Sequence, residues 1–290
     1  LSGGPYHRMR RHTHSQTRMT ASLYGCPTLI DKVEVIIMTK QNIIFKAKGS
    51  EIIRFCDIAD VVNEDILISM CKDGMSFSAV DPSHVALIEV KIGRITGKHQ
   101  QTQFGIQVKD LRESAEKSEN ITIEWSKDGK RIAVQADKWI TNIRPLDKST
   151  LTPPTLPDKV NPPHTKTVYC TIADFKLGCD RLAKISDLVG LTLDRTLTGK
   201  TSSGCSERVF AFSNKQEKRS HPTNMKKVTS GTYSLAYLGA LAKKLKPKDS
   251  INKKVCSPVT FTLSKDNYPL TVRGVEGRMS WVYFVAPRVE

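Results

Sequence analysis

A helix, a strand, a Ser-Lys-Asp turn and a second strand follow one another twice in this chain. The two turns begin at Ser126 and Ser264, so they lie 138 positions apart, close to half of the 290 residues. Residues with helical spacing precede each turn, over 109–117 in the first copy and over 233–244 in the second. Self-similarity at a fixed spacing is the signature of a duplicated structural unit. The sequence therefore predicts two similar domains.

The start of each half supports the same duplication. Ile52, Phe55 and Cys56 have the spacing of one helix face, and strand-like stretches follow between residues 66 and 92. In the second half, a helix expected over 174–187 is followed by a strand over 188–193. The predicted fold class is α+β, with antiparallel sheets and short helices in each domain.

Six prolines between positions 145 and 163 mark the boundary between the halves. Proline lacks a backbone N–H and fixes φ, so this density excludes a helix or a central strand and favours an extended, stiff connector. The predicted organisation is a basic N-terminal extension over 1–38, a first domain over 39–144, a connecting loop over 145–163 and a second domain over 164–290.

The N-terminal extension has four arginines and no acidic residue before Asp31. This composition predicts a disordered basic arm. Two alternatives stay open, because an Arg-rich start also fits an organelle-targeting peptide or a misassigned start with Met19 as the true initiator.

The charge of the chain is strongly positive. It has 45 Lys and Arg against 29 Asp and Glu, a formal net charge of +16 and a pI near 9.6. Such an excess favours a polyanion partner, because each cation that neutralises a phosphate releases a counterion. The alternative is a basic surface that is merely well solvated. Much of the excess lies in the segments 94–99 and 215–227.

Several function classes receive no support from the motifs. The seven cysteines are scattered and include no Cys-x-x-Cys pair, which argues against a zinc ribbon and against a disulfide framework. There is no P-loop, Gly-x-Ser-x-Gly, His-Glu-x-x-His or Gly-x-Gly-x-x-Gly motif. We therefore expect neither an enzyme nor a bound metal or other cofactor.

Four stretches resemble one known family. The best is Gly-Met-Ser-Phe-Ser-Ala-Val-Asp-Pro-Ser-His-Val-Ala-Leu-Ile-Glu over 74–89, and the second is Val-Tyr-Phe-Val-Ala-Pro-Arg-Val-Glu over 282–290. Residues 233–238 and the pair Leu146-Asp147 fit as well. Together they resemble, in order, the proliferating-cell-nuclear-antigen type of DNA sliding clamp of archaea and eukaryotes.

This resemblance implies a homotrimer whose subunits join head to tail in a ring, with helices lining a hole for double-stranded DNA. It implies a processivity factor that tethers DNA polymerase and other replication and repair proteins, is placed on DNA by a clamp loader, and resides with the DNA inside the cell. Two alternatives are a subunit of a heterotrimeric or checkpoint clamp and a viral processivity factor that binds DNA directly as a monomer or dimer. A nucleic-acid enzyme is a more distant alternative.

A clamp of this kind holds DNA through sequence-independent phosphate contacts from long cationic side chains. The candidates lie on the expected helices, although acidic residues outnumber Arg54 on the polar side of the first one. Simple solvation is the alternative for each of them. The candidates are Arg54, Lys109, Arg112, Lys176, Arg181, Lys184, Lys243 and Lys244.

The family's partners insert a short hydrophobic motif under the connecting loop. Residue by residue, the resemblance places that pocket at Val80, His84, Leu151, Pro153, Pro269, Phe284, Ala286 and Pro287. Plain core packing is the alternative for Val80 and Phe284.

Ring closure needs exposed strand edges that pair between subunits. We expect these edges over 131–136 in the first domain and 208–213 in the second, with an ordinary covered edge strand as the alternative. The predicted interface residues are Arg131, Ile132, Ala133, Val134, Arg208, Val209, Phe210, Ala211 and Phe212.

Overall fold

The computed structural model describes residues 43–71, 73–93, 102–115, 119–126, 129–151, 154, 166–193, 196–212, 229–246, 258–264 and 268–288. The predicted N-terminal extension and the basic segments 94–99 and 215–227 lie outside these residues. Within the described part, no helix is long and apolar enough to cross a membrane.

The first half contains eight strands and two helices. In chain order they are β1 (Ile43–Ala47), α1 (Gly49–Ala59), β2 (Asp65–Cys71), β3 (Gly74–Val80), β4 (Ala86–Gly93), β5 (Thr102–Gln107), α2 (Val108–Ala115), β6 (Ile121–Trp125), β7 (Ile132–Ala136) and β8 (Trp139–Ile143). A single 3-10 turn, η1 (Lys148–Thr150), follows in the connecting loop.

The second half repeats the same order of elements. They are β9 (Lys166–Thr171), α3 (Ile172–Leu182), β10 (Leu188–Leu193), β11 (Leu197–Ser203), β12 (Ser206–Phe212), β13 (Thr229–Ser234), α4 (Leu235–Lys244), β14 (Pro258–Leu263), β15 (Leu270–Glu276) and β16 (Met279–Val285). The predicted α+β duplication is therefore present in the described structure.

Antiparallel strands from both halves form one eight-stranded sheet, in the order β5-β2-β3-β4-β16-β15-β14-β9. The two halves meet where β4 pairs with β16, in a register that places Leu87 opposite Phe284. The remaining strands form two four-stranded sheets, β1-β6-β7-β8 from the first half and β12-β11-β10-β13 from the second.

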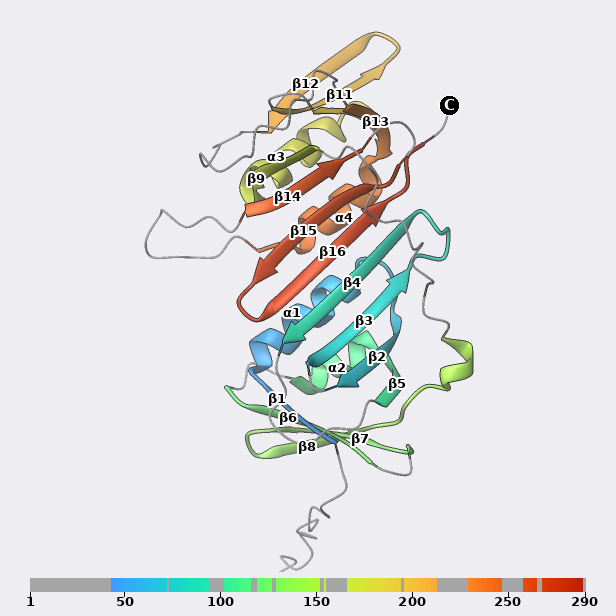
Figure 1. Cartoon of the computed structure of the whole chain (residues 1–290), viewed down its shortest axis with the longest axis vertical. Helices are drawn as coiled ribbons and strands as arrows, with labels where there is room; N and C mark the ends of the chain where they lie inside the picture. The colour runs from blue at the N-terminus through green and yellow to red at the C-terminus, as the bar shows by residue number, and fades with distance from the viewer. Residues whose placement is uncertain are drawn as a thin grey trace, which may run out of the picture. The chain divides into compact units, whose positions relative to one another are not determined.

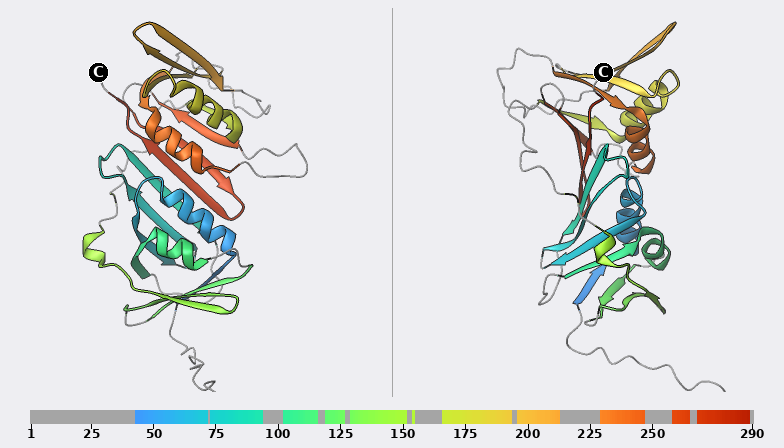
Figure 2. Two further views of the ribbon diagram at one scale, coloured as in Figure 1. Left: turned by 180° about the vertical axis from the view of Figure 1, so that it is seen from behind. Right: turned by 90° about the vertical axis from the view of Figure 1, so that its right-hand side faces the viewer.

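All four helices of the described structure lie on one face of the eight-stranded sheet, which leaves its other face uncovered by helices (Figures 1 and 2). We call these the helix face and the outer face. Apolar residues at alternate strand positions point to the helices and form the core. Equivalent aromatic pairs occur in both halves, Phe55 with Phe77 and Phe175 with Phe261, each edge to face with ring centroids about 5 Å apart.

Most elements begin and end near their expected residues, because periodicity and capping act locally. Thr171 ends β9 and caps α3: its hydroxyl accepts the Asp174 N–H at 3.0 Å and donates to the Asp174 carboxylate at 2.7 Å. The predicted helix over 174–187 therefore begins two residues earlier, at Ile172. It also ends earlier, at Leu182.

Candidate functional site

The helix face is almost neutral. Within the bounds of α1 to α4 there are seven Lys or Arg residues and six Asp or Glu residues. The excess positive charge of the chain is therefore carried by other segments.

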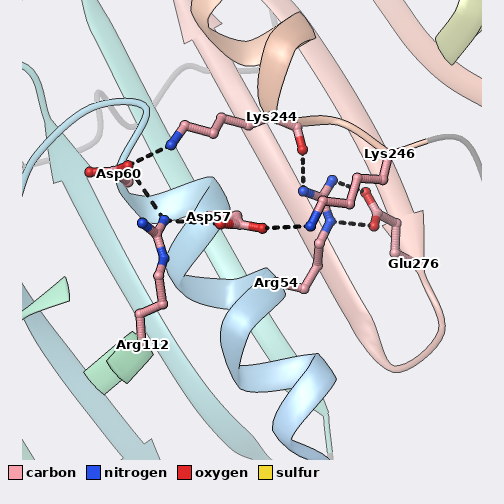
Figure 3. Close-up of polar contacts among 7 residues, drawn as sticks. All are labelled: Arg54, Asp57, Asp60, Arg112, Lys244, Lys246 and Glu276. Carbon is pink, nitrogen blue, oxygen red and sulfur yellow. Dashed lines mark hydrogen bonds and ion pairs between the residues drawn. The ribbon is translucent and has the colours of Figure 1, made fainter. Parts of the chain in front are cut away.

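Arg54 does not fit its predicted DNA-facing role. It lies on α1, and only 11% of its side chain is exposed. Its guanidinium donates two hydrogen bonds to the Glu276 carboxylate, at 2.6 and 2.7 Å, and one to the Lys244 carbonyl (Figure 3). Because a bidentate ion pair of this kind holds the cation against the protein, Arg54 joins the two halves of the chain.

A second group of ion pairs lies beside Arg54 on the same face (Figure 3). Asp60 accepts from Lys244 at 2.6 Å and from Arg112 at 3.4 Å, and Arg112 also pairs with Asp57 at 2.9 Å. Although partial burial opposes ionisation of Asp60, Lys244 and Arg112 outweigh it and lower the pKa of that carboxyl. Lys246 pairs with Asp57 at 3.2 Å. Arg112 and Lys244, two of the predicted DNA-facing cations, are thus partly neutralised by α1.

The other predicted DNA-facing residues are more accessible. Arg181, Lys184 and Lys243 are exposed, Lys176 is half-buried, and Lys109 is exposed with only a long contact of 3.9 Å to Glu113. Except for Lys109, these cations come from the second half of the chain.

The Asp-Pro-Ser-His signature forms a tight turn between β3 and β4. The buried Asp81 carboxylate accepts the backbone N–H groups of Ser83, Val85 and Ala86 at 2.5–2.9 Å. It also accepts the Tyr237 hydroxyl of α4 at 2.9 Å. Burial opposes ionisation, but these donors lower the pKa of Asp81.

His84 occupies the end of this turn with a φ of 55°, and its side chain is exposed. The Ala286 N–H donates to the Val85 carbonyl at 2.8 Å, so the two stretches that carry the family resemblance are adjacent in space. Pro287 is half-buried beyond Ala286, and Pro269 is exposed.

An apolar row crosses the outer face beside the turn. Val80 on β3 lies opposite Leu87 on β4, and Leu87 lies opposite Phe284 on β16. All three are half-buried. The structure thus brings the predicted residues Val80 and Phe284 together through Leu87, which was not among the predicted residues. Alternation along β4 was a signal that could have found it.

The connecting loop is attached to the edge strand β5. Leu146 forms a β-bridge with Gly105, and a Cβ at Gly105 would lie 2.5 Å from a methyl carbon of Leu151, so only glycine leaves room for the loop. Asp147 caps η1 by accepting the Ser149 N–H at 2.9 Å.

Leu151 and Val80 then line a pocket of about 250 Å³. Its other lining residues are Asn63, Asp65, Ile66, Leu67, Ser78, Ala79 and Thr150. Pro153, also predicted for this region, lies outside the described residues.

The predicted interface is wrong for one strand and reaches an edge with the other. The segment with Arg131, Ile132, Ala133 and Val134 leads into β7, which pairs with β6 on one side and β8 on the other. The edge of that sheet is β8 instead, where Trp139 is 70% and Ile140 55% exposed.

Strand β12 is an edge, as predicted. It carries Val209, which is 57% exposed, together with Arg208, Phe210 and Ala211, while Phe212 is buried. In the described part of the chain, no strand pairs with the outer side of β8 or β12.

The described residues contain no group of three or more His, Cys, Asp or Glu side chains that could hold a metal ion. Cys56, Cys170 and Cys179 are buried as free thiols, and burial raises the pKa of Cys56 to about 12. These thiols are therefore protonated core residues.

No protein-family model matches the chain. Two curated relatives, both named DNA polymerase sliding clamp, come from Thermoplasma acidophilum (24% identical) and Thermoplasma volcanium (23%). Each match extends over 257 residues and covers 81% of this chain and 94% of the relative.

Solved structures match closely in fold. PCNA of Thermococcus kodakaraensis has a TM-score of 0.70 at 14% identity, covering 85% of this chain and 99% of that one. PCNA of Entamoeba histolytica has a TM-score of 0.70 at 13% identity, covering 86% and 98%. PCNA of A. fulgidus, bound to the C-terminal region of FEN-1, has a TM-score of 0.68 at 19% identity, covering 85% and 98%. The predicted fold and the predicted resemblance to this type of clamp are confirmed.

Proposed function

We propose that this chain is a subunit of a DNA polymerase sliding clamp, which closes into a ring with two further copies and encircles duplex DNA. It acts as a scaffold without a catalytic step of its own. The names of the curated relatives and the PCNA fold support this proposal. The observation that carries it is the relation between the strand pair that joins the two halves and the two free edges.

Strand β4 is the third strand of its meander, as β12 is in the second half, and β16 is the last strand of its half, as β8 is in the first. Inside the chain, β4 and β16 pair along seven residues each. Their counterparts β12 and β8 carry exposed apolar side chains. An apolar edge of this kind requires a cover. We therefore expect β8 of one subunit to pair antiparallel with β12 of the next, which is a head-to-tail contact that closes when the rotation permits.

The helix face is the surface proposed for DNA. Its accessible cations would contact phosphates without reading sequence, and a nearly neutral face would let the clamp move along the duplex rather than hold one position. Lys109, Lys176, Arg181, Lys184 and Lys243 are the residues proposed for these contacts.

The outer face is proposed to hold partner proteins. The row of Val80, Leu87 and Phe284 offers an apolar surface between the connecting loop and the C-terminal residues Ala286 and Pro287. The A. fulgidus clamp with a bound C-terminal region of FEN-1 supports a protein segment as the ligand. Polymerase, clamp loader and repair proteins would compete for this row.

Two measurements test the proposal. The mass in solution should be about 97 kDa, three times the 32.4 kDa of one chain. A monomer at all salt and protein concentrations would contradict a ring. A mass of 97 kDa that forms only with a different, related chain would indicate a heterotrimer.

The second measurement separates encirclement from adhesion by charge. After loading, the protein should stay on closed circular DNA at high salt and leave once the circle is cut. Equal retention on circular and linear DNA would refute encirclement, because electrostatic adhesion does not depend on topology.

A further inference from the structure

The pocket beside the apolar row has a polar floor with unused hydrogen-bonding capacity. The Oδ1 atom of Asp65 and the Oγ atom of Ser78 are both buried, and neither has a hydrogen-bond partner among the described residues. Both residues line the pocket of about 250 Å³. A buried polar atom without a partner is destabilising, and native proteins contain few of them. Two such atoms in one pocket indicate a ligand that supplies donors.

The charge of the pocket specifies the kind of donor. Asp65 is its only charged lining residue, so no cation of the described chain neutralises it there. Glu89 on β4 lies directly opposite Ser78 and adds a second acidic group on the outer face. An ionised carboxylate only accepts hydrogen bonds, and it forms its strongest ones with Lys or Arg.

We propose that the pocket holds a Lys or Arg side chain of the partner segment that lies on the apolar row. This inference rests on the proposed function, because it needs a partner segment, and it adds a second specificity element to that site. The pocket and the row are continuous, since Val80 belongs to both and Leu151 covers the pocket.

The strand spacing fixes the position of the basic residue within the segment. Asp65 on β2 and Leu87 on β4 are two strands apart, which is about 10 Å at roughly 4.8 Å per strand. An extended peptide advances about 3.3 Å per residue. The basic residue therefore lies about three to five positions from the residue that contacts Leu87.

The test begins with selection of a random dodecapeptide library on the intact chain. Peptides that Phe284→Asp no longer binds are those on the row. They should carry Lys or Arg at the expected distance from an apolar residue. Selected row peptides without a basic residue there would refute the inference while leaving the docking site intact. Failure to select any row peptide would count against partner docking itself, which the circular-DNA measurement examines independently.

A double-mutant cycle then tests the contact directly. Changing the basic residue of the best peptide to Gln should weaken binding at least tenfold on the wild-type chain and less than twofold on Asp65→Asn. Glu64→Gln is the matched control, because this neighbouring acid is exposed and does not line the pocket, and it should behave as the wild type. Equal weakening on wild type and Asp65→Asn would overturn the inference.

Ser78→Ala separates a ligand contact from a structural role. Because the Ser78 hydroxyl has no partner among the described residues, its removal should leave the thermal midpoint unchanged or raise it, while weakening the peptide. Ser76→Ala, on the same face of β3, should affect neither property. A lower midpoint with unchanged peptide affinity would contradict the inference.

Discussion

The two halves of the chain have the same elements but opposite surroundings. In the first half, the third strand of the meander, β4, is covered by β16, and α1 is fastened by Arg54 to Glu276 and Lys244. In the second half, β12 is open in the described structure. Leu177, which is the sixth residue of α3 as Arg54 is of α1, is 42% exposed. The second half therefore resembles the first with its neighbour removed.

The helices differ in the same sense. Acidic residues of α1 neutralise cations of α2 and α4, whereas α3 and the end of α4 leave Arg181, Lys184 and Lys243 accessible. One half thus uses its charges to hold the fold together, and the other leaves them available for an external partner.

The largest expected effect comes from placing a charge on the open edge. Val209→Asp should raise the dissociation constant of the assembly by roughly 100-fold or more, because a carboxylate would be buried in an apolar contact (about 3 kcal/mol). Val275→Asp is the matched control, since Val275 is 64% exposed but lies on β15. Sedimentation or light scattering across a dilution series measures both. Equal assembly of the two variants would remove β12 from the interface.

Breaking the fastening inside the chain should have the next largest effect. Arg54→Ala leaves the Glu276 carboxylate without its partner, and 20% of that side chain is exposed, so unfolding by urea should become about 3 kcal/mol easier. Arg181→Ala, at an exposed position of α3, should change the unfolding free energy by less than about 0.5 kcal/mol. Similar values for both variants would show that the halves are not held together by this contact.

A salt titration examines the accessible cations of the second half. Changing Arg181, Lys184 and Lys243 together to Gln should reduce the slope of log K against log salt by about 0.9 for every phosphate that the variant no longer neutralises. Lys200→Gln is the control, because Lys200 is exposed on β11 and pairs with Glu207 away from the helices. An unchanged slope in the triple variant would assign DNA binding to other segments.

The smallest effect concerns one ion pair. Arg278, second in the turn before β16, donates to Glu51, third in α1, at 3.0 Å, and this contact lowers the pKa of Glu51. The same positions in the other half are held by Lys138 and Asp174. We expect these two residues to meet between subunits.

Charge reversal tests that pair. Lys138→Glu should weaken assembly by about fivefold, which is the scale of an exposed ion pair, and adding Asp174→Lys should restore it. Restoration by Asp180→Lys instead would place the neighbouring subunit differently along α3.

Local structure followed from local sequence. The apolar spacing of Ile52 and Phe55 and the Ser-Lys-Asp turns indicated α1, β6 and β7 nearly residue by residue, because periodicity and turn chemistry act over a few positions. Strand β8 was missed, since only Ile143 of its five residues is buried and no alternation marks it. The edge was consequently assigned to its neighbour.

The site depended on contacts between distant residues. Arg54 and Glu276 are 222 positions apart, so nothing near Arg54 in the sequence indicated that its charge is neutralised. Leu87 became part of the apolar row only through the register of β4 with β16. Asp65 and Ser78 are ordinary residues in the sequence, and only burial distinguishes them.

The pairing of β4 with β16 has a mechanical consequence for the proposed ring. Each subunit contributes one joint that lies within a continuous sheet and is reinforced by Arg54, and one that forms between separate chains. The two kinds alternate around the circumference. A loading machine that must part the ring to admit DNA will therefore find its weakest points at β8 and β12, while each subunit moves as a rigid segment.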